Sequence, residues 1–196
     1  RIYGSAEFIR GLARYCLWID DQQLAEAQKI TGIAQRIKTV QAMRLDSPKS
    51  ATVEAAATPH RFGEVRQIGG ETVIAIAAIS SENREYLPCG LLPKGTIVSN
   101  KCFAFYNVPL WNMALIASRL HWVWIGTACV RMRTDFSYSN TLGWNTFPVP
   151  TLTDKNKADL THCAEDILLT REAHFPATIA DLYDPDHMPA DLREAH

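Results

Sequence analysis

Apolar residues in the first third of the chain change from a continuous run to a helical spacing. The mostly apolar run from Ala13 to Ile19 predicts a buried strand. From Leu24 to Val40 apolar residues recur at every third or fourth position, which predicts an amphipathic helix, or two helices broken near Gly32. Ser47-Pro48 ends this spacing, and a short helix is expected over 49–57.

The middle of the chain carries short runs rich in β-branched and aromatic residues. Glycine and proline separate these runs, which is typical of short strands joined by turns. They predict a small sheet that is mixed or mostly antiparallel. The expected strands are Phe62–Val65, Thr72–Ala77, Glu85–Leu87, Thr96–Val98 and Cys102–Phe105.

The remainder of the chain returns to a helical pattern. Residues 109–130 are rich in Leu, Ile, Ala and Trp and predict two helices that break near Arg119. Thr153 is a suitable N-cap for a helix that ends before Pro176, and Pro189 can start a last helix. The expected fold class is therefore α/β, of the α+β kind, with a small mixed or antiparallel sheet packed with helices and a helical C-terminal segment.

The distribution of charge divides the chain near residue 150. Residues 1–150 carry 16 Lys and Arg against 11 Asp and Glu, a net charge of +5, whereas residues 151–196 carry 4 against 10, a net charge of −6. A mildly basic surface suits a phosphate backbone, whereas an acidic segment is repelled by phosphate and suits packing on protein. A solvated surface without a partner could carry the same charge. We expect two domains, 1–151 and 152–196.

The sequence carries no sign of export or of a membrane span. It opens on Arg1 in mid-pattern, without a start methionine or an apolar leader, so we expect an internal segment of a longer chain. The apolar stretch around 120–130 contains His121 and is flanked by Arg131, which favours a buried helix over a transmembrane one. The five cysteines are scattered without a C-x-x-C pair, which favours core thiols in a reducing cytoplasm over disulfides or structural zinc.

Motifs for catalysis are missing from the sequence. Methyl transfer to a base amine requires a glycine-rich S-adenosylmethionine loop and an Asn/Asp-Pro-Pro-Tyr pocket, and Asp184-Pro185-Asp186 lacks the second proline and the aromatic residue. Clustered carboxylates for a nuclease, a nucleophile elbow and a P-loop are also missing. We expect no catalytic residue, metal or cofactor in this chain. An enzyme that uses His60 or His121 is the weakest alternative, because the sequence offers neither a convincing partner.

Arginine and aspartate alternate in the segment around residue 134. In an extended strand Arg133 and Asp135 would point to one side, with Thr134 between them. Arg can make a bidentate bond to guanine O6 and N7, and Asp can accept from cytosine N4, so the pair could read one G·C base pair in a major groove. An ordinary surface ion pair between the two side chains is the alternative.

Asn100 and Lys101 form a second candidate for reading bases. Asn suits adenine N6 and N7, and Lys suits guanine O6 and N7. The alternative is a turn formed by Asn100 beside a solvated Lys101.

Other polar residues suit the phosphates and sugars of a DNA backbone. These candidates are Lys49, Ser80, Ser81, Arg84, Tyr138 and Asn140. The alternatives are a solvated helix face around Lys49, a surface ion pair of Arg84 with Glu82 or Glu85, and a core position for Tyr138.

Ordered blocks of the sequence resemble one protein family. Phe136-Ser137-Tyr138-Ser139 and Phe147-Pro148-Val149-Pro150 resemble the end of the target-recognition domain of MmeI-like DNA methyltransferases, which are fused restriction-modification enzymes. Gly4 to Ile9, with Arg14 to Ile19, resembles the opening strand of that domain. Further blocks follow in the family's order at 58–66, 80–88 and 180–185. Ordered blocks of this length are more specific than a lone short motif.

The resemblance implies a domain that recognises a DNA sequence. It implies a target-recognition domain over 1–151, with base-reading residues at Asn100-Lys101 and at 133–135, and a truncated C-terminal helical segment over 152–196. The implied partners are double-stranded DNA and the methyltransferase domain of the same parent chain, which would act on adenine N6 with S-adenosylmethionine in a bacterial cytoplasm. The parent chain could also carry a restriction endonuclease. A protein–protein docking module that joins subunits through its apolar helices and acidic segment is the alternative.

Overall fold

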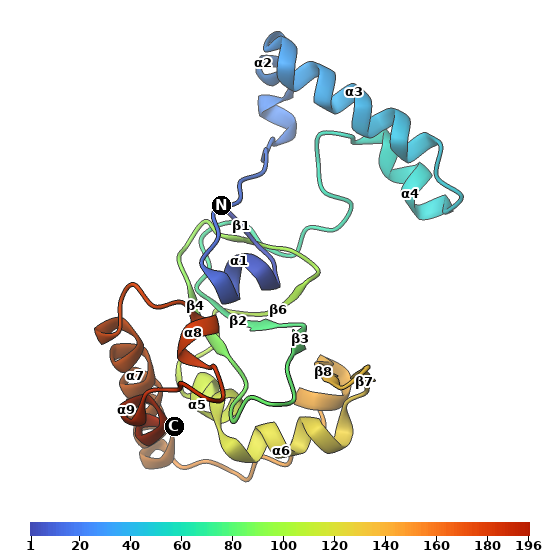
Figure 1. Ribbon diagram of the computed structural model, residues 1–196. Helices are drawn as coiled ribbons and strands as arrows, with labels where there is room; N and C mark the ends of the chain where they lie inside the picture. The colour runs from blue at the N-terminus through green and yellow to red at the C-terminus, as the bar shows by residue number, and fades with distance from the viewer. The chain divides into compact units, whose positions relative to one another are not determined.

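The chain divides into two compact units. The computed structural model describes residues 1–196 (Figure 1). Residues Arg1–Arg14 and Gly69–His196 form one unit, here called the sheet unit, and residues Tyr15–Ile68 form the other, here called the helical unit. The fold is a mixture of helices and small sheets, which confirms the predicted class.

Three helices form the helical unit. They are α2 (Leu24–Lys29), α3 (Thr31–Leu45) and α4 (Ser50–Glu54), and single 3-10 turns at Asp21–Gln23 and Ala55–Ala57 precede α2 and follow α4. Ile30 separates α2 from α3 because its backbone is extended, with a ψ of 107°. The predicted helix pair is confirmed, and its break lies just before Gly32. The short helix expected over 49–57 is also confirmed.

Two predicted strands of the helical unit are wrong. Residues 13–19 and 62–65 are irregular, and among residues 13–19 Ile19 alone is buried. A strand needs a neighbour that satisfies its backbone N–H and C=O groups along its length. Neither segment belongs to a sheet, although the carbonyl of Arg14 accepts one bond from the N–H of Ile2. Both segments lie near the ends of the helical unit, where apolar residues alone do not produce a strand.

The sheet unit is built on β2 (Val73–Ala77), which is buried along its whole length. It pairs antiparallel with β4 (Cys89–Leu92) on one side and with β6 (Cys102–Tyr106) on the other. Ile74 and Ile76 face the larger core, whereas Val73, Ala75 and Ala77 face the smaller one. Because both faces are covered, the strand contains apolar residues at every position.

Helices from both sides of residue 152 form the larger core. They are α5 (Trp111–Ala117), α6 (Arg119–Ala128), α7 (Asp154–Ala173), α8 (Ile179–Leu182) and α9 (Ala190–Ala195). Met113 and Ile116 of α5 and Ala164 and Ile167 of α7 belong to the same cluster of buried residues. Residues after 152 therefore share a core with the sheet.

Side-chain caps mark the starts of α6 and α7. The break between α5 and α6 lies at Ser118, whose Oγ accepts from the backbone N–H of His121 at 3.1 Å. Thr153 caps α7, and Asn156 bonds back to the backbone of Thr153. Both reciprocal bonds satisfy N–H groups that a helix start leaves free. The predicted positions of these two helix starts are confirmed.

The smaller core lies under the first residues of the chain. β1 (Ile2–Tyr3) pairs parallel with β5 (Ile97–Val98), and α1 (Ser5–Arg10) contributes Phe8 and Ile9. The opening strand that the resemblance implied over 4–9 is wrong, because these residues form α1 after a two-residue strand.

A third sheet consists of β3, β8 and β7, in this order across the sheet. β3 (Ile79–Ser80) pairs antiparallel with β8 (Asp135–Ser137), and β8 pairs antiparallel with β7 (Arg131–Met132). The sequence did not predict these three strands, which are only two or three residues long. The strand predicted at 85–87 is wrong, since a bend occupies these positions and the strand starts at Cys89.

His121 makes the stability of the fold depend on pH. Its side chain is fully buried, its Nε2 lies 3.3 Å from the hydroxyl of Tyr138, and burial lowers the pKa of His121 to about 4. The folded state therefore keeps the ring neutral where an unfolded chain, with a pKa near 6.5, takes up a proton. The free energy of unfolding should fall as pH falls from 6.5 to about 4, by roughly 3 kcal/mol from this residue.

Urea unfolding at pH 7, 5.5 and 4.5 measures this loss. The variant His121→Leu should lose less stability on acidification than the unaltered chain does. His162→Leu is the control, because His162 is exposed, and it should keep the full loss. Equal acid sensitivity in His121→Leu and the unaltered chain would contradict a buried, neutral His121.

Candidate nucleic-acid interface

The segment with alternating arginine and aspartate forms a tight hairpin. Met132 of β7 pairs with Asp135 of β8, so Arg133 and Thr134 are the two residues of the connecting turn. Arg133 has a φ of 60°, the left-handed conformation that side chains other than glycine rarely adopt. Arg133 and Asp135 therefore do not lie on one extended strand, which is the geometry that would have pointed both side chains to one side. Arg133 lies at the exposed tip, and Asp135 starts the returning strand half-buried.

The 131–137 hairpin rests on α6. Phe136 is buried and packs edge-on against Trp122, with ring centroids 4.7 Å apart. Gly126 lets α6 approach this ring, because a Cβ at that position would lie 3.2 Å from Cζ of Phe136. A regular helix therefore supports the hairpin, which favours a fixed tip over a mobile one.

Arg131 makes three contacts at the base of the hairpin. Its Nη1 donates to Oε2 of Glu82 and to the backbone carbonyl of Thr134, the latter at 3.0 Å. Its Cζ lies 4.5 Å from the ring centroid of Phe136. No sequence pattern predicted this arrangement, since 49 positions separate Glu82 from Arg131.

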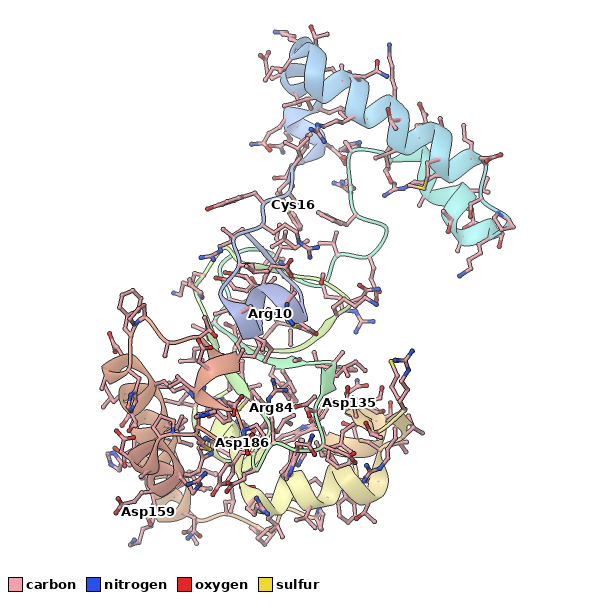
Figure 2. All side chains as sticks on the ribbon, viewed as in Figure 1. Arg10, Cys16, Arg84, Asp135, Asp159 and Asp186 are labelled. Carbon is pink, nitrogen blue, oxygen red and sulfur yellow. The ribbon has the colours of Figure 1, made fainter.

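Arg84 lies among the carboxylates beside the hairpin (Figure 2). Its Nη1 donates to Oγ of Ser80 at 3.2 Å. Burial lowers the pKa of Arg84, and the neighbouring carboxylates of Asp135 and Asp184 raise it. Three residues that the sequence analysis selected, Ser80, Arg84 and Asp135, are thus brought together. The surface ion pair of Arg84 with Glu82 or Glu85 does not form, since Glu82 pairs with Arg131 and Glu85 with Arg193.

Burial separates the candidate phosphate contacts into two groups. Ser80 and Tyr138 are 2% and 4% exposed, so a phosphate cannot reach them in this structure. Tyr138 is a core residue that touches His121 and Phe103, and its burial raises the pKa of Tyr138. The direct phosphate contacts expected for these two are therefore not retained. Ser81, Arg84, Asn140 and Lys49 stay at least partly exposed, with Lys49 in the helical unit at the start of α4.

Asn100 and Lys101 form an exposed turn between β5 and β6. The backbone N–H of Cys102 donates to the carbonyl of Ser99 at 3.0 Å, which closes the turn around them. The hydroxyl of Ser5 donates to the carbonyl of Lys101 and ties the turn to α1. Asn100 therefore lies in a turn, as the alternative interpretation expected, and the side chains of Asn100 and Lys101 are both exposed.

Ala78 connects this turn to the hairpin. Its N–H donates to the carbonyl of Lys101 at 3.0 Å, and its carbonyl accepts from the N–H of Tyr138 at 2.9 Å. Tyr138 directly follows β8, whose first residue is Asp135. Two segments about 30 residues apart in sequence are therefore joined through one residue of the sheet unit.

The helical unit contains a polar cluster that the sequence did not indicate. Nε2 of His60 lies 2.7 Å from Oδ1 of Asp21, and Nη2 of Arg61 lies 2.8 Å from Oδ2 of the same carboxylate. His60 thus has a partner, far from it in sequence. A cavity of about 320 Å³ beside it is lined by Trp18, Ile19, Asp20, His60, Arg61, Phe62, Val65, Gln67 and Ile68.

The structure contains no cluster of side chains that could hold a metal ion. No three His, Cys, Asp or Glu side chains gather in a suitable cluster. Cys89, Cys102 and Cys129 are buried, as expected of core thiols, but Cys16 is half-buried and Cys163 is exposed. The hydropathy and length of the helices identify none that could span a membrane.

Comparison with known proteins identifies the family. The models of the MmeI target recognition domain and the MmeI C-terminal domain match residues 1–151 and 152–196. DNA methyltransferase A of Bacillus subtilis (strain 168) is 34% identical over 196 residues, which cover 100% of this chain and 22% of that protein. The solved structure of the Type IIL restriction-modification enzyme MmeI in complex with DNA has a TM-score of 0.95 and 32% identity, over 100% of this chain and 26% of that one. The chain spans 22% to 26% of these relatives and belongs to the MmeI family, matching its target recognition domain and its C-terminal domain.

Proposed function

We propose that this chain reads a short DNA sequence on behalf of a DNA methyltransferase that acts at adenine N6. The observation that carries the proposal is the 131–137 hairpin, which presents Arg133 at an exposed tip and rests on α6. A two-stranded ribbon of this kind fits the major groove of B-DNA. The solved MmeI structure is a complex with DNA, which supports the same partner for this chain.

The hairpin offers complementary chemistry to one G·C base pair. The guanidinium of Arg133 can donate to guanine O6 and N7, and the carboxylate of Asp135 can accept from cytosine N4. Thr134, between them at the tip, can contact either base edge or a thymine methyl group. The left-handed backbone of Arg133 supports a functional role, because such conformations outside glycine are retained most often at binding sites.

Other residues of the two units can supply further contacts to DNA. Asn100 and Lys101 can read a second position, since Ala78 joins their turn to the strand of Asp135. Ser81, Arg84 and Asn140 of the sheet unit, and Lys49 of the helical unit, are proposed to contact the DNA backbone. Such contacts fix the register of the protein on the duplex without reading sequence.

Catalysis belongs to another part of the proposed parent chain. We assign target recognition to residues 1–151. The acidic, helical segment 152–196 is assigned to packing against protein. A methyltransferase domain of the same parent would supply the S-adenosylmethionine site and the pocket for the flipped adenine. We further propose that the parent chain also carries a restriction endonuclease and that it is located in a bacterial cytoplasm.

A protein–protein docking module is the second candidate function. The observation that favours it is the exposure of large apolar side chains on the helical unit, among them Tyr15 at 74% and Ile68 at 93%. The two candidates differ in their response to salt, because phosphate binding releases counterions and apolar docking does not.

Salt dependence of DNA binding distinguishes these two candidates. The chain alone should bind duplex DNA with a dissociation constant on the order of 10⁻⁴ to 10⁻⁶ M and with little sequence preference, because the methyltransferase part that would face it across the DNA is missing. The slope of log affinity against log salt should be about −0.9 for each phosphate contact. Fluorescence anisotropy between 50 and 200 mM salt, roughly the range in which such slopes are measured, tests this. The absence of DNA binding even at about 50 mM salt would favour the docking module, and DNA binding that is insensitive to salt would contradict phosphate contacts.

Exchanging the two charges at the hairpin tests base reading. In the full-length protein, Arg133→Glu with Asp135→Arg should change or relax one position of the methylated motif, since one good base contact contributes roughly 1–3 kcal/mol of discrimination. Sequencing of methylated sites from cells that express the variant measures the motif. An active protein with an unchanged motif would contradict the proposal.

Arg133→Gly separates this effect from a loss of folding. Glycine adopts a φ of 60° without strain, so this variant should keep the hairpin while losing the guanidinium. It should fold with unchanged or higher stability and still relax the same motif position. A uniform loss of activity across sequences would indicate a phosphate contact instead.

A further inference from the structure

The guanidinium of Arg131 contacts three groups of the protein at the base of the hairpin. Its guanidinium bonds the Glu82 carboxylate and the Thr134 carbonyl and lies over the Phe136 ring. The Thr134 carbonyl belongs to the turn itself, so Arg131 reaches from the first strand to the tip. Both hydrogen bonds use Nη1, so this nitrogen is committed to the protein and links Glu82 to the turn.

Glu82 provides the counter-charge from outside the hairpin. It lies in the turn between Ser81 and Arg84, where the N–H of Arg84 bonds the carbonyl of Ser81 at 3.3 Å. This turn follows β3, which pairs with β8. A carboxylate is repelled by phosphate, so Glu82 is unsuited to a direct DNA contact. Its place against Arg131 requires another explanation.

Stability of the fold does not supply that explanation. The side chains of Arg131 and Glu82 are 46% and 34% exposed, and ion pairs in such positions contribute little to stability. The pair does, however, set the position of the Thr134 carbonyl, which lies between Arg133 and Asp135 in sequence. Small displacements at such a tip are enough to separate a side chain from a base edge.

We propose that Glu82 and Arg131 are positioning residues for base reading, which hold the hairpin tip so that Arg133 and Asp135 meet the same base pair. The inference rests on the proposed function and extends it to two residues that act on the hairpin and not on a base. Glu82 acts through Arg131, and Arg131 acts through the Thr134 carbonyl. Both residues therefore determine specificity at the base pair that the hairpin reads.

A double-mutant cycle in the full-length protein tests the proposal. The readout is selection from a duplex library randomised at each motif position, which gives the preference for the correct base at every position. Glu82→Ala and Arg131→Ala should each lower the preference at the hairpin position by about tenfold and leave other positions unchanged. The double variant should lose about tenfold and not a hundredfold, because both changes remove one linkage. Glu82→Gln should retain most of the preference, since its amide oxygen can still accept from Arg131.

Other roles for these residues give different results. If Arg131 bound a phosphate, Arg131→Ala would weaken binding to all sequences about equally, and Glu82→Ala would strengthen it. If Arg131 read a base directly, Arg131→Ala would lose far more preference than Glu82→Ala, because Glu82 would only orient Arg131. Either result overturns the proposal, as does an unchanged preference in Glu82→Ala. Asp159→Ala is the matched control, because it breaks an exposed ion pair with Lys155 on α7 and should change no preference.

The design separates failure of this inference from failure of the proposed function. The hairpin position is the one whose preference changes in the variant Arg133→Glu with Asp135→Arg. If that variant changes no position, the proposed base reading fails, and the positioning role fails with it. If that variant changes one position and Glu82→Ala changes none, the positioning role alone fails.

Discussion

The burial of β2 on both faces is the constraint on which the sheet unit depends. Ile74 and Ile76 anchor the larger core, and Val73, Ala75 and Ala77 anchor the smaller one. A single strand therefore fixes the helices of the larger core and α1 of the smaller one. Because every side chain of β2 is enclosed, a shift of register by one residue would exchange its two apolar sets between cores of different size. The register of β4 and β6 is accordingly well determined.

The elements proposed to read bases depend on the continuation of this strand. Ala78 directly follows β2 and bonds both the 99–102 turn and the residue after β8. β3 then pairs with β8, and Phe136 of β8 packs on Trp122 of α6. Arg133 at the exposed tip is thus two residues away from Asp135, the first residue of β8, which pairs with strands on both sides. This arrangement gives a small loop the rigidity that discrimination between bases requires.

The sequence predicted elements best where one local signal is sufficient. The helix start at Thr153 was found because a capping residue acts within three or four positions of the helix, and the break near Arg119 was found from the apolar pattern. Strands at 73–77 and 102–106 were found because apolar and β-branched residues are dense there. The run from Ala13 to Ile19 has the same texture but no strand beside it, so its prediction was wrong.

The candidate site was predicted in part, for a related reason. Residue type alone identified Arg133 and Asp135 as able to read bases, and the resemblance to a family supported their position. The backbone of Arg133 was not predicted, because a two-residue turn is set by the pairing of Met132 with Asp135 and not by the local pattern. The burial of Ser80 and Tyr138 and the contact of Glu82 with Arg131 depend on tertiary packing over tens of residues. No spacing rule in the sequence reports such contacts.

A structure of the full-length protein bound to its target duplex tests the central claim most directly. The account predicts the 131–137 hairpin in the major groove, with Arg133 bonded to guanine O6 and N7 and Asp135 accepting from N4 of the paired cytosine. It also predicts that Arg131 keeps its bonds to Glu82 and to the Thr134 carbonyl. A hairpin that lies away from the groove, or an Arg133 bonded to phosphate while other residues read that base pair, would contradict it.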